Sequence, residues 1–313
     1  MNTNISEMQQ ALLSTFKSFV AYCEANEITY YAAYGTLIGA VRHHGFIPWD
    51  DDIDVYMKRP DYDKFLKNRE KLLNSTCRIC DVLDGQSPYP CAKFYSTQGT
   101  IWEYRHFPFI VGPWIDVFPL DEGSKGDVHA KKVFDKLYYH MWKYRKALSY
   151  FTWKEIGEDL VHGDILNSAI NIVKKVRYVP FKHSYLKEIA RDFDDVRRIK
   201  GDMLQGYCGA MENEFYEKSW FEDAIVCPFE DTTIIVPKGY HDCLTLWYGD
   251  YMQLPPENQR KGTHGGFYTN LSKNMTREEV LKICKDKGSS STKMSFKVLL
   301  DELKHRKGFS LSK

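Results

Sequence analysis

The 313-residue sequence predicts an α/β (α+β) fold with an additional region that is mostly helical. Up to about residue 126, amphipathic helical segments alternate with short segments rich in β-branched and aromatic residues. From Asp127 onward the pattern changes to long segments with helical spacing. We therefore expect a core from residues 1–126, a helical insert over 127–227, and a C-terminal segment, 228–313, that completes the core.

The N-terminal elements are expected in the order helix, strand, turn and helix. Apolar residues recur at helical spacing over about 6–26, which predicts an amphipathic helix. The β-branched and aromatic run 28–34 predicts a strand that ends at Gly35 and Thr36. A short helix is expected at 37–42, a strand at 53–57, and a helix at 61–73.

The remaining elements follow from the same periodicities. Proline and glycine separate them, and the chain contains no internal repeat. Further strands are expected at 78–83, 92–96, 100–104, 114–120 and 232–236. Further helices are expected at 127–150, 158–178, 183–207 and 238–248, and as a terminal pair divided at 288–292.

Composition excludes several classes of protein. Lysine and arginine total 43 against 42 acidic residues, so there is no basic field to hold nucleic acid. The N-terminal segment lacks the apolar core of a signal peptide, and no stretch approaches the ~18 apolar residues of a membrane span. We therefore expect a cytoplasmic protein. The eight cysteines are dispersed, and Cys77 and Cys80 should face opposite sides of a strand, so we expect free thiols.

Four aspartates crowd the entrance to the strand expected at 53–57. Asp50, Asp51, Asp52 and Asp54 would repel one another strongly without cations. Alternation along an extended chain puts Asp52 and Asp54 on one side, where Asp50 can join them, and Asp51 on the other. All-oxygen ligands favour Mg²⁺ or Mn²⁺. The alternative is a solvated acidic turn.

Two neighbouring features favour a metal-assisted site. Gly35 and Thr36 lie at a strand-to-helix junction, where backbone N–H groups can hold a phosphate. Asp116 is a carboxylate inserted among apolar neighbours in the strand expected at 114–120, which is costly unless it reaches a metal or a hydrogen bond. If the two strands are adjacent, Asp116 can serve as a third ligand beside Asp52 and Asp54, or accept a proton from an attacking hydroxyl.

Residues 34–54, YGTLIGAVRHHGFIPWDDDID, closely resemble the signature of the LicD family, which is shared with fukutin-related sugar-phosphate transferases. The likeness continues through Lys93-Phe-Tyr95 and residues 115–120 and 248–256. It covers about 28–121 and, more loosely, 228–265. The resemblance implies a nucleotidyltransferase-type mixed sheet and a metal triad of Asp52, Asp54 and Asp116.

The resemblance also implies the reaction. Family members that transfer phosphocholine or ribitol phosphate use CDP-activated donors. We therefore expect Mg²⁺-dependent transfer of a phospho-headgroup, with phosphocholine as first choice, to a hydroxyl of a glycan or its lipid-linked precursor, with release of CMP. His264 resembles a family histidine in a loop that could close over the phosphates; a plain loop role is the alternative.

The expected substrate contacts come from a few polar residues. Gly35 and Thr36 would hold a phosphate, and Arg42 or Lys93 would neutralise charge on the departing CMP. For Arg42 and Lys93 a purely structural role is the alternative. A choline headgroup would need aromatic rings, but in a chain with seven tryptophans packing alone can place rings near any site, so no cage is assigned to Trp49, Trp102, Tyr104, Trp114 or Phe118.

Other interpretations stay open. The same residues suit a nucleotidyltransferase that adds NMP to a small molecule or protein and releases pyrophosphate, and a non-catalytic scaffold could keep the aspartates for structure. The helical insert should shape the acceptor side. Basic residues at 174–177, Lys182 and 304–307 suit either solvated helix faces or peripheral contact with the inner face of a membrane.

Overall fold

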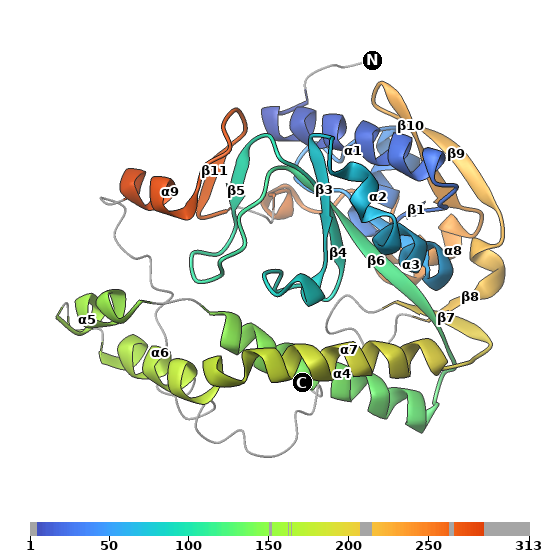
Figure 1. Ribbon diagram of the computed structural model, residues 1–313. Coiled ribbons are helices and arrows are strands. Elements are labelled where there is room, and N and C mark those ends of the chain that lie inside the picture. Colours follow the sequence, from blue (N-terminus) through green and yellow to red (C-terminus); the bar gives the residue numbers. More distant parts are fainter. Residues whose placement is uncertain are drawn as a thin grey trace.

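The computed structural model describes residues 5–149, 152–161, 163, 165–206, 215–262 and 266–284. Seven strands of this part of the chain form one mixed sheet (Figure 1). They are β1 (Tyr31–Ala32), β2 (Asp54–Lys58), β3 (Cys77–Cys80), β4 (Ala92–Ser96), β6 (Trp114–Gly123), β7 (Met203–Gly206) and β8 (Phe215–Glu217).

The order in the sheet is β1-β2-β6-β4-β3, and β7 and β8 extend it beside β6. Strand β6 is long enough to pair with β4 through its first half and with β7 through its second half. The β2 and β6 pair is parallel, whereas the other pairs are antiparallel. The mixed α/β architecture expected from the sequence is therefore confirmed.

Helices and two small ladders surround this sheet. The helices are α1 (Glu7–Ala25), α2 (Tyr34–Ile38), α3 (Arg59–Lys67), α4 (Val128–Leu148), α5 (Trp153–Val161), α6 (Ile165–Arg177), α7 (Lys182–Arg198), α8 (Tyr240–Tyr248) and α9 (Arg277–Ile283). The ladders pair β9 (Ala224–Phe229) with β10 (Thr232–Pro237), and β5 (Thr100–Trp102) with β11 (Tyr268–Asn270). None of the helices within the described ranges is long and apolar enough to cross a membrane.

Helix α1 begins with a capping box. The Ser6 side chain accepts a hydrogen bond from the backbone N–H of Gln9, and the Gln9 side chain accepts one from the backbone N–H of Ser6. Its apolar face is buried, and the observed range Glu7–Ala25 matches the helix expected over about 6–26. Local spacing and capping therefore determine this element.

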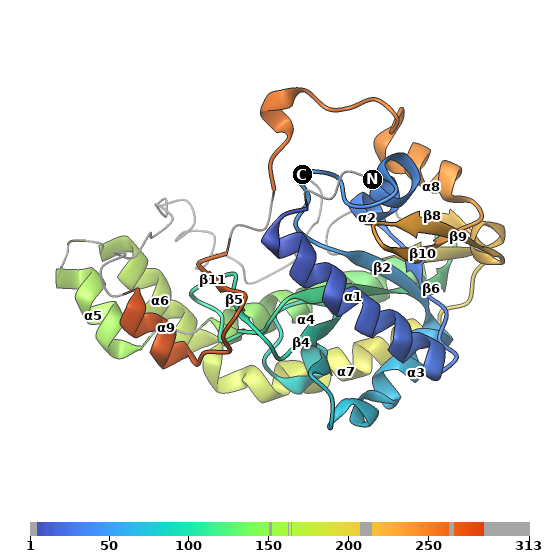
Figure 2. The same ribbon diagram turned by 90° about the horizontal axis from the view of Figure 1, so that it is seen from above.

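Helices α1 and α3 cover one face of the sheet, as Figure 2 shows for α1. Phe19 of α1 is fully buried, and its ring lies 5.5 Å from that of Phe94 in β4 and 6.1 Å from that of Phe65 in α3. Because side chains alternate along a strand, Phe94 faces α1 and Lys93 faces the other side. The polar residues of the candidate site lie on that other side.

Helices α4 and α7 pack side by side and form a second hydrophobic core with the region around Trp114 (Figure 1). The observed α4 matches the helix expected at 127–150. The helix expected over 183–207 is wrong at its end: α7 stops at Arg198, and β7 follows. The chain turns there to pair with β6, and Gly201 packs so closely that a Cβ would lie 2.0 Å from the carbonyl oxygen of Gly123.

Several other expectations differ from the structure. The strand expected over 28–34 is reduced to Tyr31–Ala32, because α2 already begins at Tyr34. Strand β9 was not predicted, and residues 100–102 pair with β11 outside the main sheet. The terminal helices expected around 288–292 lie outside the described residues, apart from α9. The division at 126 and 227 stays a prediction, although β7 and β8 from the insert join the main sheet.

Short helical turns connect these elements. A π-helical turn, Gly39–His43, continues α2. The 3₁₀ turns are Arg69–Leu72, Val82–Asp84, Val179–Phe181, Lys218–Phe221 and Glu257–Gln259. In the described residues, seven cysteines, Cys77 and Cys80 among them, form no disulfide.

Candidate active site

A row of charged side chains crosses three neighbouring strands. In the parallel pair, Asp54 of β2 lies opposite Asp116 of β6; in the antiparallel pair on the other side of β6, Asp116 lies opposite Lys93 of β4. Paired residues of neighbouring strands project from the same face of a sheet. Lys93, Asp116 and Asp54 therefore form one row, which we call the charged row. The adjacency of Asp54 and Asp116 expected from the sequence is confirmed, whereas their roles stay predictions.

The Asp116 carboxylate is buried and closely surrounded. It is 7% exposed, and one oxygen accepts a hydrogen bond from Lys93 Nζ at 2.5 Å. The other oxygen accepts one from Trp114 Nε1 at 2.8 Å, and the Cys91 thiol donates to the first oxygen at 3.5 Å. These contacts fix the orientation of Asp116 at the centre of the row.

Lys93 lies between two aromatic rings. Its ammonium is 4.3 Å from the ring centroid of Tyr89 and 4.4 Å from that of Trp114, and the residue is only 2% exposed. The Tyr89 hydroxyl in turn donates to Glu103. Burial lowers the pKa of Lys93, but the Asp116 carboxylate, together with Cys91 and Glu103, outweighs this effect, so the pKa of Lys93 is raised and the side chain stays charged. The ammonium of Lys93 thus forms an ion pair with Asp116.

The remaining aspartates crowd the end of the row that Asp54 occupies. Burial, followed by the charges of Asp52 and Asp116, raises the pKa of Asp54 well above its usual range. Burial and the neighbouring Asp52 raise the pKa of Asp50 to about 8. These directions show that several carboxylates share a site whose negative charge Lys93 alone does not balance.

The sequence suggested that Asp52 lies on a strand, but β2 begins only at Asp54. The residue before β2 is nevertheless bound to β6, because the Asp116 N–H donates to the carbonyl oxygen of Ile53 at 2.9 Å. The Asp51 carboxylate lies beside Gly262, where a Cβ would approach it to 2.8 Å. Asp51 therefore contacts the segment that follows α8.

Gly35 and Thr36 lie directly against the acidic cluster. The Asp54 N–H donates to the Thr36 hydroxyl at 2.9 Å. A Cβ at Gly35 would lie 2.7 Å from a carboxylate oxygen of Asp50, so only glycine leaves Asp50 in its place. The first turn of α2 and the acidic cluster are thus in contact, as expected if phosphate and metal ligands are placed together.

Arg42 contacts a distant segment of the chain. Its Nη1 donates to the carbonyl oxygens of Tyr251 and Gln253, at 2.5 and 3.4 Å, and its Nε donates to His43 at 3.0 Å. Arg42 therefore holds the loop after α8 against the π-helical turn. His264 lies outside the described residues, and the substrate roles assigned to Arg42, Lys93 and His264 stay predictions.

The residues that orient the row were not assigned from the sequence. Tyr89 and Cys91 were not considered for the site, and Trp114 was considered only as an aromatic neighbour. A signal for Trp114 was present, because it precedes Asp116 by two residues on one strand and must share its face. No comparable signal existed for Tyr89 or Cys91, whose positions depend on the loop before β4.

The chain resembles known proteins in two comparisons. Residues 27–149 match the family model described as LicD/FKTN/FKRP, nucleotidyltransferase domain. Lipopolysaccharide cholinephosphotransferase LicD of Haemophilus influenzae is 33% identical over 269 residues, which is 83% of this chain and 96% of that protein. An uncharacterized protein of Rickettsia prowazekii is 53% identical over 36 residues, 12% of this chain and 14% of its own length. The family model spans the charged row, and the alignment with the Haemophilus protein covers almost the whole of that relative; the chain therefore belongs to the LicD family.

Proposed function

We propose that this chain is a phosphotransferase that moves phosphocholine from CDP-choline to a hydroxyl of a lipopolysaccharide glycan or its lipid-linked precursor and releases CMP. The relative that is 33% identical over 96% of its length is named a lipopolysaccharide cholinephosphotransferase, which supports the headgroup and the acceptor. The donor and the cation are inferred from the chemistry of the site.

The observation that carries the proposal is the charged row beside α2. Asp54 and Asp116 lie opposite each other on parallel strands, and Gly35 and Thr36 contact the same cluster. Transfer at phosphorus requires that negative charge be neutralised while a nucleophile is positioned. Buried carboxylates next to a helix start are suited to that task when a divalent ion is present.

Magnesium fits the donor set, which consists of the carboxylates of Asp50, Asp52, Asp54 and Asp116. Burial, followed by the charges of neighbouring carboxylates, raises the pKa values of Asp50 and Asp54, and a cation would stabilise their charged forms. In the described residues, no three acidic, histidine or cysteine side chains are already grouped as ligands of one ion. We therefore expect the carboxylates of Asp50, Asp52 and Asp54 to reorient toward the fixed Asp116 carboxylate on binding. The bound ion would neutralise the diphosphate of the donor.

The transfer step follows from this arrangement. The oxygen of an acceptor hydroxyl attacks the phosphorus of the phosphocholine group, the bond from that phosphorus to the bridging oxygen breaks, and CMP leaves with that oxygen. A carboxylate of the cluster accepts the hydroxyl proton, and Asp116 is the candidate. Lys93 and Trp114 keep Asp116 in one orientation, and the Thr36 hydroxyl fixes the backbone of Asp54.

The direct test is a donor panel. The purified chain is incubated with Mg²⁺, a lipopolysaccharide acceptor that lacks phosphocholine, and CDP-choline, CDP-ethanolamine, CDP-glycerol or CDP-ribitol. We expect CMP release with CDP-choline and a matching mass increase of the acceptor, and loss of both with EDTA. A parallel incubation with NTPs tests the nucleotidyltransferase alternative, which release of pyrophosphate would support. If neither CMP nor pyrophosphate is released, the scaffold alternative is supported.

Asp54→Asn provides the matched variant. It keeps the shape of the side chain but removes a charge, so we expect at least a ~100-fold loss of turnover and a melting temperature within a few degrees of the parent chain, since repulsion is relieved. Asp231→Asn, which removes a surface carboxylate that is 67% exposed in its side chain, serves as the control. Equal turnover in the two variants would contradict the assigned role of Asp54.

A further inference from the structure

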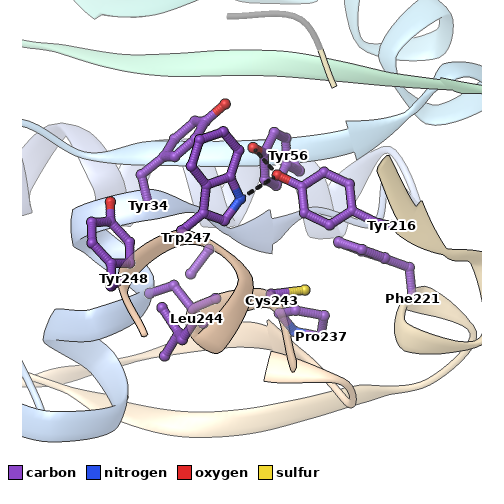
Figure 3. A pocket seen from close by; sticks show the side chains of 11 residues that line it. Tyr34, Tyr56, Tyr216, Phe221, Pro237, Cys243, Leu244, Trp247 and Tyr248 are labelled. Atoms are coloured by element: carbon purple, nitrogen blue, oxygen red, sulfur yellow. Dashed lines mark hydrogen bonds between the residues drawn. The ribbon is translucent and has the colours of Figure 1, made fainter. Parts of the chain in front are cut away.

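A pocket lined almost wholly by aromatic and aliphatic side chains lies on the face of the sheet that carries the charged row. Figure 3 shows the side chains that line it. Segments far apart in the sequence form it: the β1–α2 region, β2, β8 with the 3₁₀ turn that follows it, the end of β10, and helix α8. Its lining residues are Ala32, Tyr34, Leu37, Tyr56, Tyr216, Phe221, Pro237, Cys243, Leu244, Trp247 and Tyr248. None of the aromatic residues weighed for a cage in the sequence is among them.

Two lining residues of the pocket are close in sequence to residues of the candidate active site. Tyr56 follows Asp54 by two residues on β2 and therefore lies on the same face of the sheet. Tyr34 directly precedes Gly35, and its ring centroid lies 5.2 Å from that of Tyr56 and 5.5 Å from that of Trp247. The first aromatic rings of the pocket thus adjoin the acidic cluster.

The spacing suits a headgroup that joins the two sites. Residues two apart on a strand are separated by about 6.6 Å, which is the distance expected between the Cα atoms of Asp54 and Tyr56. In phosphocholine, phosphorus and nitrogen are joined through four bonds of about 1.5 Å each, so an extended headgroup spans about 5 Å. A phosphorus atom held at the carboxylates would place the nitrogen at the rings.

The lining chemistry selects among ligands. The lining side chains include no carboxylate, amide, guanidinium or ammonium group. The Tyr216 hydroxyl accepts a hydrogen bond from Trp247 Nε1 at 2.7 Å and shares another with the Tyr56 hydroxyl at 2.9 Å (Figure 3). A cytosine base or a sugar needs several polar partners, whereas a quaternary ammonium cannot donate a hydrogen bond and is held by aromatic faces.

We propose that this pocket receives the trimethylammonium group of the phosphocholine that is transferred, and that it makes the enzyme prefer choline over primary-amine headgroups. The inference rests on the proposed function. The pocket is narrow, with room for little more than a water molecule. An occupant therefore requires an outward rotation of a ring at the rim, where Tyr248 is 45% exposed.

The backbone of Tyr34 supports a dedicated position for its ring. Its φ is +45°, in the left-handed region that non-glycine residues rarely adopt. Strain of this kind persists only where the surrounding structure maintains it, and it is concentrated at functional sites. Here it turns the chain from β1 into α2, so that Tyr34 enters the pocket while the next residue, Gly35, contacts Asp50.

The test compares ring removal with ring retention at one position. Binding of phosphocholine and of phosphoethanolamine to the full chain is measured by calorimetry for the parent, Tyr34→Phe and Tyr34→Leu. We expect Tyr34→Phe to keep the preference for phosphocholine, and Tyr34→Leu to weaken phosphocholine binding about tenfold with little change for phosphoethanolamine. Trp247→Phe and Trp247→Leu form a second pair if Tyr34→Leu does not fold.

The outcomes separate this inference from the proposed function. Equal loss for both ligands in the leucine variants, or no loss for either, overturns the pocket assignment, even if the parent releases CMP from CDP-choline. A ring-dependent preference for phosphocholine in a chain that releases no CMP from any donor keeps the pocket and overturns the transfer reaction. Ring-dependent preference together with CMP release supports both.

Discussion

Replacing Lys93 by methionine tests whether this residue serves chiefly to hold Asp116. The Lys93 ammonium and the Asp116 carboxylate are 2.5 Å apart, and their side chains are 3% and 10% exposed. Methionine has nearly the length of lysine and packs well against the rings of Tyr89 and Trp114. The substitution therefore removes the charge while largely preserving the packing.

The expected cost follows from the burial of the pair. Breaking a buried ion pair by removing one partner leaves an uncompensated charge and costs about 3–5 kcal/mol. The same change at Lys17, which pairs with Asp231 at 2.7 Å with side chains 44% and 67% exposed, should cost no more than about 1 kcal/mol. The double variant Lys93→Met with Asp116→Asn should recover about 2 kcal/mol, because the stranded carboxylate is gone.

Urea-induced unfolding, followed by far-UV circular dichroism in EDTA, gives the free energies of unfolding of the parent chain and the three variants. The reasoning is refuted if Lys93→Met costs no more than Lys17→Met, or if adding Asp116→Asn causes a further loss. In either case the Lys93 and Asp116 pair would not be a stabilising element. Lys93 would then be free to act on the leaving CMP, as the sequence first suggested.

Three further predictions concern packing, pH and the loop after α8. Gly201→Ala should lower the free energy of unfolding by about 1–3 kcal/mol, since its Cβ would meet the Gly123 carbonyl oxygen at 2.0 Å. The control Gly157→Ala in α5, where nothing lies within 4 Å of the Cβ position, should be neutral or stabilising. Urea midpoints that reverse this order would contradict the packing. Burial, followed by nearby cationic side chains, lowers the pKa of His106 to about 4, so below about pH 6.5 only the unfolded chain binds the proton and the free energy of unfolding should fall. In His106→Gln the urea midpoint should depend less on pH between pH 7 and pH 5. An unchanged slope would argue against this effect of His106. Arg42→Gln removes the contacts with the carbonyl oxygens of residues 251 and 253. Trypsin should therefore cut within 249–261 faster than in the parent chain. An equal rate would show that Arg42 does not hold this loop.

Elements that depend on neighbouring residues could be predicted from the sequence. The spacing of apolar residues and the capping residues define α1, and strand β4 matches its expected range of 92–96. The aspartates, Asp116 included, were chosen because their local settings are costly without a function, and Gly35 and Thr36 because they lie at a strand-to-helix junction. The LicD resemblance, which the comparisons confirm, rests on the same local runs.

Elements that depend on distant partners could not be predicted. The sequence extended α7 to residue 207, because nothing local shows that Gly201 must fit against Gly123 and that β7 must pair with β6. It could not show that Arg42 binds carbonyl oxygens more than 200 residues away in the chain, while the substrate role expected of Arg42 stays a prediction. Periodicity identifies the face that a residue occupies, but not the segment that covers that face.

The sequence by itself determined which side chains could perform phosphoryl transfer and that they occur next to strand ends. Only the tertiary structure decided that Lys93 pairs with Asp116 and that rings from residues 34, 56, 216 and 247 meet in one pocket. The physical reason is that strand register and the packing of distant segments minimise the free energy of the whole chain, and no local pattern records that choice.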